Sequence, residues 1–542
     1  MGVSNEGDVI KNNVISFFER DYPLIKLFKF GNEILLYDAK PHLVFIISKE
    51  EIDVLIDFLS GKPETEVINI HSRRLSGEYV KQLLTKYEEL KNNGVFIKGP
   101  VDQISPLNRD EIEEQLKYYD ENILLRKFCL EVTEDCNYRC TYCKRTIAKG
   151  YKGHSKNHLS AENARQGINY YFKKYTGFFN KLSKDKKKLL LEILPPSLSF
   201  YGGEPFLNFE LIKKSAAYFK SLPWHEYSIS PGDLKFSSNT NLSIMTNQIL
   251  GFLTENRVHL FASLDGPAEE HDKCRVFKDG AGTFEVAYGN LLKIRNFSEA
   301  YFKERVTILG VYTSKHNRGQ CVDFTRNIGA LGCEHFPAEY VGSFVPNVEL
   351  ALADFNDSRE KRWADFQEKA AAESKNQDIK IEYFAHLLPF AKLNYDHPAG
   401  KNSLQIMLTC PMGFDNLMLA ASGEFLICHK VDDSMPIGDC EFGLDFETLI
   451  DLNQRYNTAI NNNECKNCWI VNFCSVCAAT RMARNGFINP TKRECDYFRQ
   501  RLFYDFSCFV HLALEHPALL QKIFDYRNDI SKYIGIIDIN EF

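Results

Sequence analysis

Three cysteines, Cys136, Cys140 and Cys143, stand within eight residues of this chain in a C-x3-C-x2-C arrangement. Such a group constrains the fold strongly, because one loop must present three thiols to a common point. Thiolates are soft, anionic ligands that suit iron–sulfur clusters and zinc. Three ligands can hold three corners of a [4Fe-4S] cluster and leave the fourth iron open, as catalysis requires. The alternatives are an incomplete zinc site or a set of buried thiols.

The other cysteines of the chain also point to metal rather than to disulfides. The chain has 16 cysteines, and its first residues lack the apolar segment of a signal peptide. No uncharged apolar stretch approaches the ~20 residues that cross a bilayer. The formal net charge of -6 gives no reason to expect nucleic-acid binding. We therefore expect a cytoplasmic protein with neither a membrane nor a nucleic-acid partner.

From residue 128 onward, apolar runs of strand type alternate with helical patterns, one of them at 161–174 behind Ser160 as an N-cap. This alternation predicts a parallel α/β sheet, in which chemistry collects at the carboxyl ends of the strands. The six strand candidates are residues 128–132, 198–201, 242–245, 258–263, 306–312 and 335–340.

The first hundred residues have the pattern of a separate small module. Apolar runs at 34–37 and 44–47 predict strands, and helical patterns follow from Ser48 to 58 and over 79–90. This order resembles a winged-helix-type unit; the alternative is a stabilising N-terminal extension. We divide the chain into this module (1–100), a linker (101–127), the α/β region (128–345), a helical bridge (346–400), a cysteine-rich segment (401–500) and a helical tail (501–542).

The spacing of the first cysteine group, with the aromatic Tyr142 before its last cysteine, resembles the signature of the radical S-adenosylmethionine (SAM) superfamily. That resemblance implies a partial (β/α)6 barrel and a [4Fe-4S] cluster on Cys136, Cys140 and Cys143. The cluster would reduce SAM to methionine and a 5'-deoxyadenosyl radical, which abstracts hydrogen from the substrate. The segment Gly202-Gly203-Glu204-Pro205 looks like the motif of this family whose backbone receives the SAM amino group.

Further along, a block of spaced residues resembles the sulfatase-maturase-like branch of the same superfamily. It runs from Ser263 through Asp265 to Arg275 and the Gly-Thr-Phe at 282–284. The resemblance implies that Ser263 and Asp265 lie near SAM and that Arg275 binds its carboxylate, for which a guanidinium fork is well shaped. The resemblance also implies a SAM contact at Asn247, where we place the end of the third strand, although Gln248 replaces the glycine that the family usually has next.

The C-terminal cysteines resemble the SPASM domain, which carries auxiliary clusters in many peptide-modifying radical SAM enzymes; two C-x2-C pairs could also bind zinc. Sulfatase maturases have a further cysteine where this chain has Asn416, so Cys440 fills the gap or one iron stays open. They also have an aspartate base where this chain has His429, which argues against formylglycine formation. The resemblance implies one cluster on Cys410, Cys428 and Cys477 and another on Cys465, Cys468, Cys474 and Cys495.

The pattern as a whole favours an enzyme that modifies a ribosomally made precursor peptide. The N-terminal module resembles a peptide-recognition element that binds a leader segment as an added strand. We expect hydrogen abstraction followed by a thioether or another side-chain crosslink, with three [4Fe-4S] clusters, SAM and a flavodoxin- or ferredoxin-type electron donor. The alternatives are a protein oxidase of the sulfatase-maturase type and a peptide-binding homologue without activity.

Overall fold

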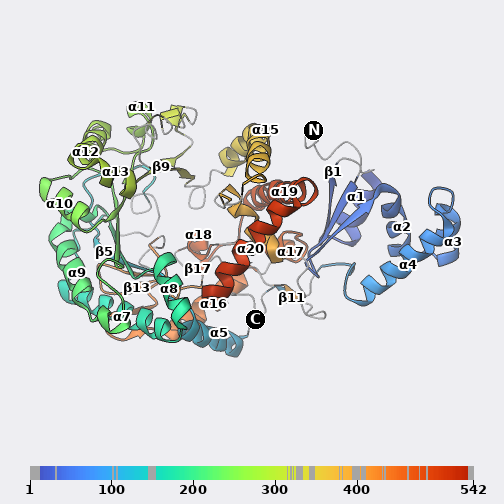
Figure 1. The fold of residues 1–542 in the computed structure, drawn as a ribbon, viewed down its shortest axis with the longest axis horizontal. Coiled ribbons are helices and arrows are strands. Elements are labelled where there is room, and N and C mark those ends of the chain that lie inside the picture. The colour runs from blue at the N-terminus through green and yellow to red at the C-terminus, as the bar shows by residue number, and fades with distance from the viewer. Residues whose placement is uncertain are drawn as a thin grey trace.

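The fold is that of a computed structural model (Figure 1). The structure describes residues 12–30, 33–100, 103–104, 108–143, 154–313, 315–317, 320–321, 323–324, 327, 334–340, 348–376, 379–380, 383–392, 403–404, 411–429, 431, 435–460, 463–474, 477–483 and 486–534. All structural statements below concern these residues.

A curved sheet of parallel strands forms the centre of the larger part of the molecule. Its first six strands neighbour one another in chain order, which confirms the expected α/β class. They are β5 (Lys127–Thr133), β6 (Ser197–Gly202), β7 (Lys235–Thr240), β8 (His259–Ser263), β9 (Val306–Tyr312) and β10 (Glu334–Tyr340). Helices on the convex side connect them, namely α7 (Ala161–Asn180), α8 (Lys184–Ile193), α9 (Phe209–Ser221), α10 (Asn247–Glu255), α12 (Phe284–Phe297) and α13 (Glu299–Arg305) (Figure 1).

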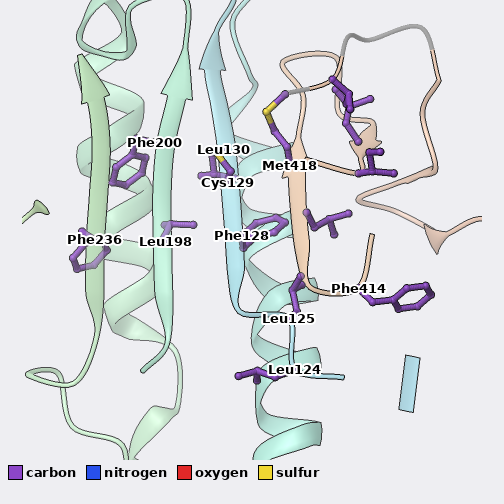
Figure 2. Close-up of a cluster of buried hydrophobic side chains, with 14 of the residues drawn as sticks. Leu124, Leu125, Phe128, Cys129, Leu130, Leu198, Phe200, Phe236, Phe414 and Met418 are labelled. Atoms are coloured by element: carbon purple, nitrogen blue, oxygen red, sulfur yellow. The ribbon is translucent and has the colours of Figure 1, made fainter. Parts of the chain in front are cut away.

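The core lies between this sheet and its helices. Phe128 of β5 stacks on Tyr171 of α7 with ring centroids 5.6 Å apart, and Phe236 of β7 meets Phe219 of α9 at 5.8 Å. Gly167 of α7 lets the helix approach closely, since a Cβ there would lie 2.6 Å from Leu419 Cδ2. Ser160 caps α7 as expected, accepting a hydrogen bond from the backbone N–H of Asn163. Figure 2 shows the apolar side chains of the neighbouring strands.

Two features of the sheet differ from the sequence expectation. Residues 242–245, expected as the third strand, form a loop, and the strand β7 ends at Thr240. The sheet also extends beyond β5 by two strands of the cysteine-rich segment, β12 (Asn416–Leu419), parallel to β5, and β13 (Phe425–Leu426), antiparallel to β12 (Figure 2). Buried Asp415 accepts two hydrogen bonds from Arg126, which joins the start of β12 to that of β5.

The N-terminal residues 12–100, called the recognition module below, form a three-stranded antiparallel sheet with a second hydrophobic core. The sequence predicted its second and third strands and two of its helices, with Ser48 and Glu51 forming a capping box. It missed the first strand and two helices. The elements are α1 (Asn12–Asp21), β1 (Ile25–Phe30), β2 (Glu33–Asp38), β3 (Leu43–Ser48), α2 (Lys49–Leu59), α3 (Glu64–His71) and α4 (Gly77–Asn92).

Between the recognition module and the curved sheet lie the C-terminal helices (Figure 1). α19 runs across the expected boundary at residue 500, so the tail and the cysteine-rich segment share a helix. No helix that the structure describes combines the length and apolarity needed to span a membrane. The remaining elements are β4 (Gln103–Ile104), α5 (Arg109–Asn122), η1 (Pro205–Asn208), η2 (Trp224–Tyr227), α11 (Ala268–His271), α15 (Val348–Glu373), η5 (Ala385–Lys392), β11 (Ser403–Leu404), β14 (Gly438–Asp439), β15 (Gly443–Leu444), α16 (Phe446–Ile460), α17 (Asn463–Lys466), η6 (Val471–Phe473), α18 (Ala478–Arg481), β16 (Met482–Ala483), β17 (Gly486–Phe487), α19 (Lys492–Glu515) and α20 (Pro517–Ile534).

Candidate functional site

Cys136, Cys140 and Cys143, the proximal triad, lie on the loop that follows β5 at the carboxyl edge of the sheet. The backbone of the loop is fixed by its neighbours. Arg139 donates its N–H to Val276 O at 2.7 Å, and Thr141 donates to Cys274 O at 2.9 Å. The triad loop is therefore paired with the segment that leads from β8 toward α12, although more than a hundred residues separate the two in sequence.

Gly202 and Gly203 hold the other side of the triad loop. The backbone N–H of Gly203 donates to Thr133 O at 2.9 Å, and that of Glu204 donates to Asp135 O at 2.9 Å. A Cβ on Gly203 would lie 2.1 Å from Asp135 O, so no larger residue fits without displacing the chain. The sequence suggested that these glycines make room for a ligand. The structure shows that they allow the end of β6 to approach the backbone of residues 133–135, which lead into the triad loop.

Glu204 joins the ends of β6 and β7. Its carboxylate is fully buried and accepts hydrogen bonds from Thr240 Oγ1 at 2.9 Å and from the Asn241 N–H at 2.7 Å. Burial raises the pKa of Glu204 to about 7, against the lowering effect of these hydrogen bonds. Glu204 thus sets the spacing of two strand ends, and its expected contact with SAM stays a prediction.

Asn241 is a site residue that the sequence analysis missed. Its Nδ2 donates to Asn137 Oδ1 at 3.0 Å and lies 3.7 Å from Cys136 Sγ. The expected placement of Asn247 at the end of the third strand is wrong, because Asn247 is an exposed first residue of α10. The pair at the strand end is Thr240-Asn241, and Leu242 after it adopts a left-handed φ of 62°, a conformation typical of glycine. A second Thr-Asn pair six residues earlier was the available signal.

Asp265, Arg275 and Tyr142 form one cluster beside the triad, in which Asp265 and Arg275 are buried and Tyr142 is half-buried. Asp265 Oδ2 accepts hydrogen bonds from Arg275 Nε at 2.8 Å and from Tyr142 Oη at 2.5 Å, and Oδ1 accepts from the Val311 N–H at 2.8 Å. The Arg275 guanidinium also lies over the Tyr142 ring, 5.4 Å from its centroid. Because Asp265 binds Arg275 through Nε, the Nη pair at the tip of the side chain can meet a ligand carboxylate.

Hydrogen bonds fold the rest of the segment from Ser263 to residue 284 into one unit, which accounts for the spacing of its residues in the sequence. His271 Nδ1 accepts from the Asp265 N–H at 3.2 Å, and its Nε2 lies 3.1 Å from Thr283 Oγ1. Asp272 Oδ1 accepts from the Thr283 N–H at 2.7 Å, and a Cβ on Gly282 would lie 2.2 Å from Asp272 Oδ2. Ser263 ends β8 at the same edge and is half-buried.

The chemistry of the triad fits an iron–sulfur cluster. Burial raises the pKa of Cys136 to about 12, and the negative charges of Glu204 and of the other two thiolates add to the rise. Thiolates in this position need a cationic partner, which iron supplies as it displaces the protons. Across the described ranges, no three His, Cys, Asp or Glu side chains are arranged around a single metal ion. The ligands of a cubane stand further apart, because each binds a different iron atom.

The structure brings together Cys465, Cys468, Cys474 and Cys495, called the distal set below. Burial raises the pKa of Cys474 to about 12, and the charges of Cys468, Cys465 and Cys495 act on it in the same direction. Burial alone would lower the pKa of the neighbouring Arg499. The negative charges of Cys468 and Cys495 outweigh burial, so the pKa of Arg499 is raised. These four residues are the ones expected to share a cluster, and they come from α17, the loop after it and the first turn of α19.

The remaining cysteines of the cysteine-rich segment are Cys410, Cys428, Cys440 and Cys477. Cys410 lies outside the described residues, and Cys428 and Cys477 are half-buried. Cys440 donates its N–H to Gly423 O, and its thiol meets Gln166 of α7 at 3.4 Å.

His429 approaches the proximal site. Its ring lies edge-on to that of Tyr201, with centroids 5.1 Å apart. Tyr201 is the residue before Gly202 in β6, so the segment after β13 reaches the carboxyl edge of the main sheet. This contact places a titratable side chain of the cysteine-rich segment next to the residues expected to bind SAM.

Comparison with known proteins finds a characterised relative and several solved structures. No family model matches the chain. The chain is 25% identical over 410 residues to the radical SAM cyclopropyl synthase TigE of Paramaledivibacter caminithermalis, a match that spans 72% of this chain and 74% of the relative. The resemblance to radical SAM enzymes is confirmed.

Several of the solved structures found match this chain over nearly the whole of their own length, among them the following two. One is anSMEcpe with bound AdoMet, at a TM-score of 0.48 and 18% identity over 74% of this chain and 99% of that one. The other is SuiB of Streptococcus suis bound to its precursor peptide SuiA, at a TM-score of 0.42 and 13% identity over 88% of this chain and 99% of that one.

Proposed function

We propose that this protein is a radical SAM maturase that modifies a ribosomally made precursor peptide. The modification begins with hydrogen abstraction and ends in a thioether or another side-chain bond. The similarity over 410 residues to a radical SAM cyclopropyl synthase carries the proposal. It is supported by the triad loop, which the β6 glycines and the segment 274–276 hold from two sides.

The residues at the carboxyl edge of the sheet have distinct tasks in this proposal. When bound at the triad, the cluster supplies the electron that cleaves SAM to a 5'-deoxyadenosyl radical. Arg275 binds the carboxylate of SAM through its Nη pair, while Asp265 and Tyr142 fix the guanidinium from behind. Ser263 offers a hydroxyl at the end of β8. Asn241 and Glu204 keep the triad loop and the strand ends in register.

His429 is the proposed base. Its contact with Tyr201 supports a position beside the reacting substrate, where a neutral imidazole could take the proton lost as the new bond forms. The peptide gives one hydrogen atom to the 5'-deoxyadenosyl radical, then one electron to an auxiliary cluster and one proton to His429, and so becomes two hydrogens lighter. A crosslink and a three-membered ring give the same mass change, so the type of bond must come from fragmentation.

The recognition module is the proposed binding site for the leader segment of the precursor. Its strand β3 stands at the edge of the three-stranded sheet, and Ile46 on this strand is 56% exposed. An edge strand presents unpaired backbone groups to which an extended peptide can add. On α4, exposed Tyr79 donates a hydrogen bond to Glu51 of α2, so an aromatic ring flanks the start of the helix that follows β3.

The proposal includes two auxiliary clusters, one at the distal set and one at Cys410, Cys428 and Cys477. The distal set supports the first of these, because its four thiols are neighbours. The thiol of Cys440 donates a hydrogen bond to Gln166 of α7, which favours an open iron in the other cluster, to which a substrate thiolate could bind. A cytoplasmic setting, with a flavodoxin or ferredoxin as electron donor, would keep the thiols reduced for iron.

The test is a mass-spectrometric assay with anaerobically reconstituted enzyme, SAM, a low-potential reductant and each small peptide encoded beside the gene. We expect one peptide to lose two hydrogen atoms in proportion to the deoxyadenosine formed. The matched control is Cys140→Ala, which should give neither product. Deoxyadenosine without any modified peptide would contradict the proposal, and conversion of a sulfatase peptide to formylglycine would replace it.

A further inference from the structure

The recognition module is packed against the loop that joins two halves of the distal set. This loop, residues 469–473, is called the docking loop, and it follows Cys468 and precedes Cys474. Phe28 of β1 meets the Trp469 ring edge-on at 5.6 Å, and the ring of His42 lies 4.9 Å from that of Phe473. Both aromatic residues of the docking loop therefore neighbour a cysteine of the distal set and touch the recognition module.

A buried hydrogen-bond group joins the same two parts. Asn472 Nδ2 donates to Ala39 O at 2.5 Å and lies 3.0 Å from His42 Nδ1, which is also 3.0 Å from Tyr37 Oη. Ala39 and Tyr37 are fully buried, and His42 is 4% exposed with a left-handed φ of 58°. One side chain of the docking loop thus fixes the turn between β2 and β3, the strand proposed to receive the leader.

The helix α19 makes the contact continuous. Phe506 stacks on Phe28 with centroids 5.0 Å apart and also meets Tyr37 at 5.0 Å. Cys495, the last member of the distal set, lies three turns earlier on this helix. The docking loop and α19, which carry or adjoin the distal set, thus pack against one face of the recognition module.

We propose that the docking loop positions the recognition module, so that cluster assembly on the distal set fixes the module and raises its affinity for the precursor. Metal ligation orders the segment between its ligands, because a cluster must hold Cys468 and Cys474 at a set separation. The coupling is reciprocal, so a bound leader in turn favours the ordered loop. The affinity half of this inference rests on the proposed function, whereas the positioning half does not.

The positioning half is tested by hydrogen exchange on the full anaerobic protein. In Cys474→Ser we expect amides of residues 22–30 and 36–42 to exchange about tenfold faster, since the docking contacts then open more often. Amides of α4, on the far side of the module, should keep their rates. Loss of the distal iron with unchanged exchange at 22–42 would overturn the inference.

A second variant leaves every cysteine in place. Asn472→Asp keeps the shape of the side chain but replaces the donor with an acceptor that faces Ala39 O. We expect unchanged iron content, faster exchange at 36–42, and about a tenfold higher KM for the peptide modified in the mass-spectrometric assay, the effect of one lost buried hydrogen bond. The kcat at saturating peptide, and the KM for a peptide without its leader half, should not change. A purely structural defect would lower kcat and iron content together.

Asn467→Asp is the matched control, because it makes the same charge change at an exposed position just before Cys468. It should leave exchange at 36–42 and the KM unchanged. Equal effects of the two variants would contradict a specific role for Asn472. If no peptide is modified or bound at all, the proposed function fails, but the exchange data still decide whether the docking loop positions the module.

Discussion

The proximal triad lies on one loop whose backbone is hydrogen-bonded on both sides, whereas the distal set is spread over two helices and a loop packed by aromatic rings. The proximal loop is fixed by the N–H groups of Arg139, Thr141, Gly203 and Glu204. The distal set depends on Trp469, Phe473 and Phe506, which also contact the recognition module. The backbone hydrogen bonds tie the proximal loop to the strand ends of the sheet, whereas the aromatic contacts tie the distal set to the recognition module.

This difference matches the tasks that we propose for the two regions. A site that positions SAM against an open iron needs a rigid frame, since small displacements of reacting groups cost large factors in rate. A region that joins a peptide-binding module to an electron-transfer centre needs contact area. If the two regions differ in this way, substitutions in the triad region and in the distal set should have different effects.

The largest expected difference is between Cys140→Ala and Cys474→Ser. Loss of Cys140 opens the proximal cluster site, so deoxyadenosine formation should fall at least about a thousandfold, to background, since the cofactor carries this chemistry. Loss of Cys474 should abolish the peptide product but lower peptide-free deoxyadenosine formation only a few-fold. Iron content and deoxyadenosine, measured for both variants, check this. Cys508→Ala, a buried cysteine outside both groups, is the control; equal loss in both test variants would erase the distinction.

Gly203→Ala tests the rigid frame of the triad. The new methyl group would lie 2.1 Å from Asp135 O, so the triad loop must move. We expect the barrel to lose about 2–3 kcal/mol of stability, together with iron at the triad, in thermal unfolding and metal analysis. Gly251→Ala in α10 is the control, because nothing lies within 4 Å of its Cβ, and it should gain roughly 0.5–1 kcal/mol. Wild-type behaviour of Gly203→Ala would refute the close approach.

Arg275→Lys probes the SAM-binding side of the triad region. A lysine has a single ammonium group and cannot serve Asp265 and a ligand carboxylate together. The KM for SAM should rise about tenfold, equivalent to ~1.4 kcal/mol, while iron content stays the same. The exposed pair of Arg257 with Glu304 supplies the control, Arg257→Lys, for which no change is expected. An unaltered KM for SAM in Arg275→Lys would remove Arg275 from the site.

The smallest effect concerns the helix that carries Cys495. Thr491 caps α19 and forms a capping box with Glu494, which also pairs with Arg481 at 2.5 Å. Thr491→Ala should cost about 1 kcal/mol and slow cluster assembly at the distal set without affecting the triad. Thr458→Ala, at an exposed position of α16, should change stability by less than roughly 0.5 kcal/mol. Iron loading followed over time would show a specific effect, and equal loading rates would exclude it.

Much of the triad region could be predicted from sequence, because its motifs depend on local spacing. The strands before Thr133 and Gly202 and the cap at Ser160 follow from apolar runs and capping rules. The strand β7 was misplaced because its sequence, KFSSNT, is mostly polar, and the more apolar 242–245 lies just after it. A strand at 242–245 predicts Thr246-Asn247 at the strand end, whereas the pair at the strand end is Thr240-Asn241, six residues earlier.

The long-range parts of the fold could not be predicted in the same way. Nothing in the sequence around Asn416 shows that β12 pairs with β5 across nearly three hundred residues. Likewise, Phe28 and Asn472 read as ordinary core and loop residues until their partners are known. Patterns of a single segment report its secondary structure and its buried face, but not which distant segment covers that face.

The most direct test of the central claim is electron paramagnetic resonance of the anaerobic, reduced protein before and after SAM is added. We expect a [4Fe-4S] signal that shifts on addition of SAM. This SAM-responsive signal should be absent in Cys140→Ala and should persist in Cys474→Ser. Zinc at the triad, or a signal that is the same with and without SAM, would contradict it.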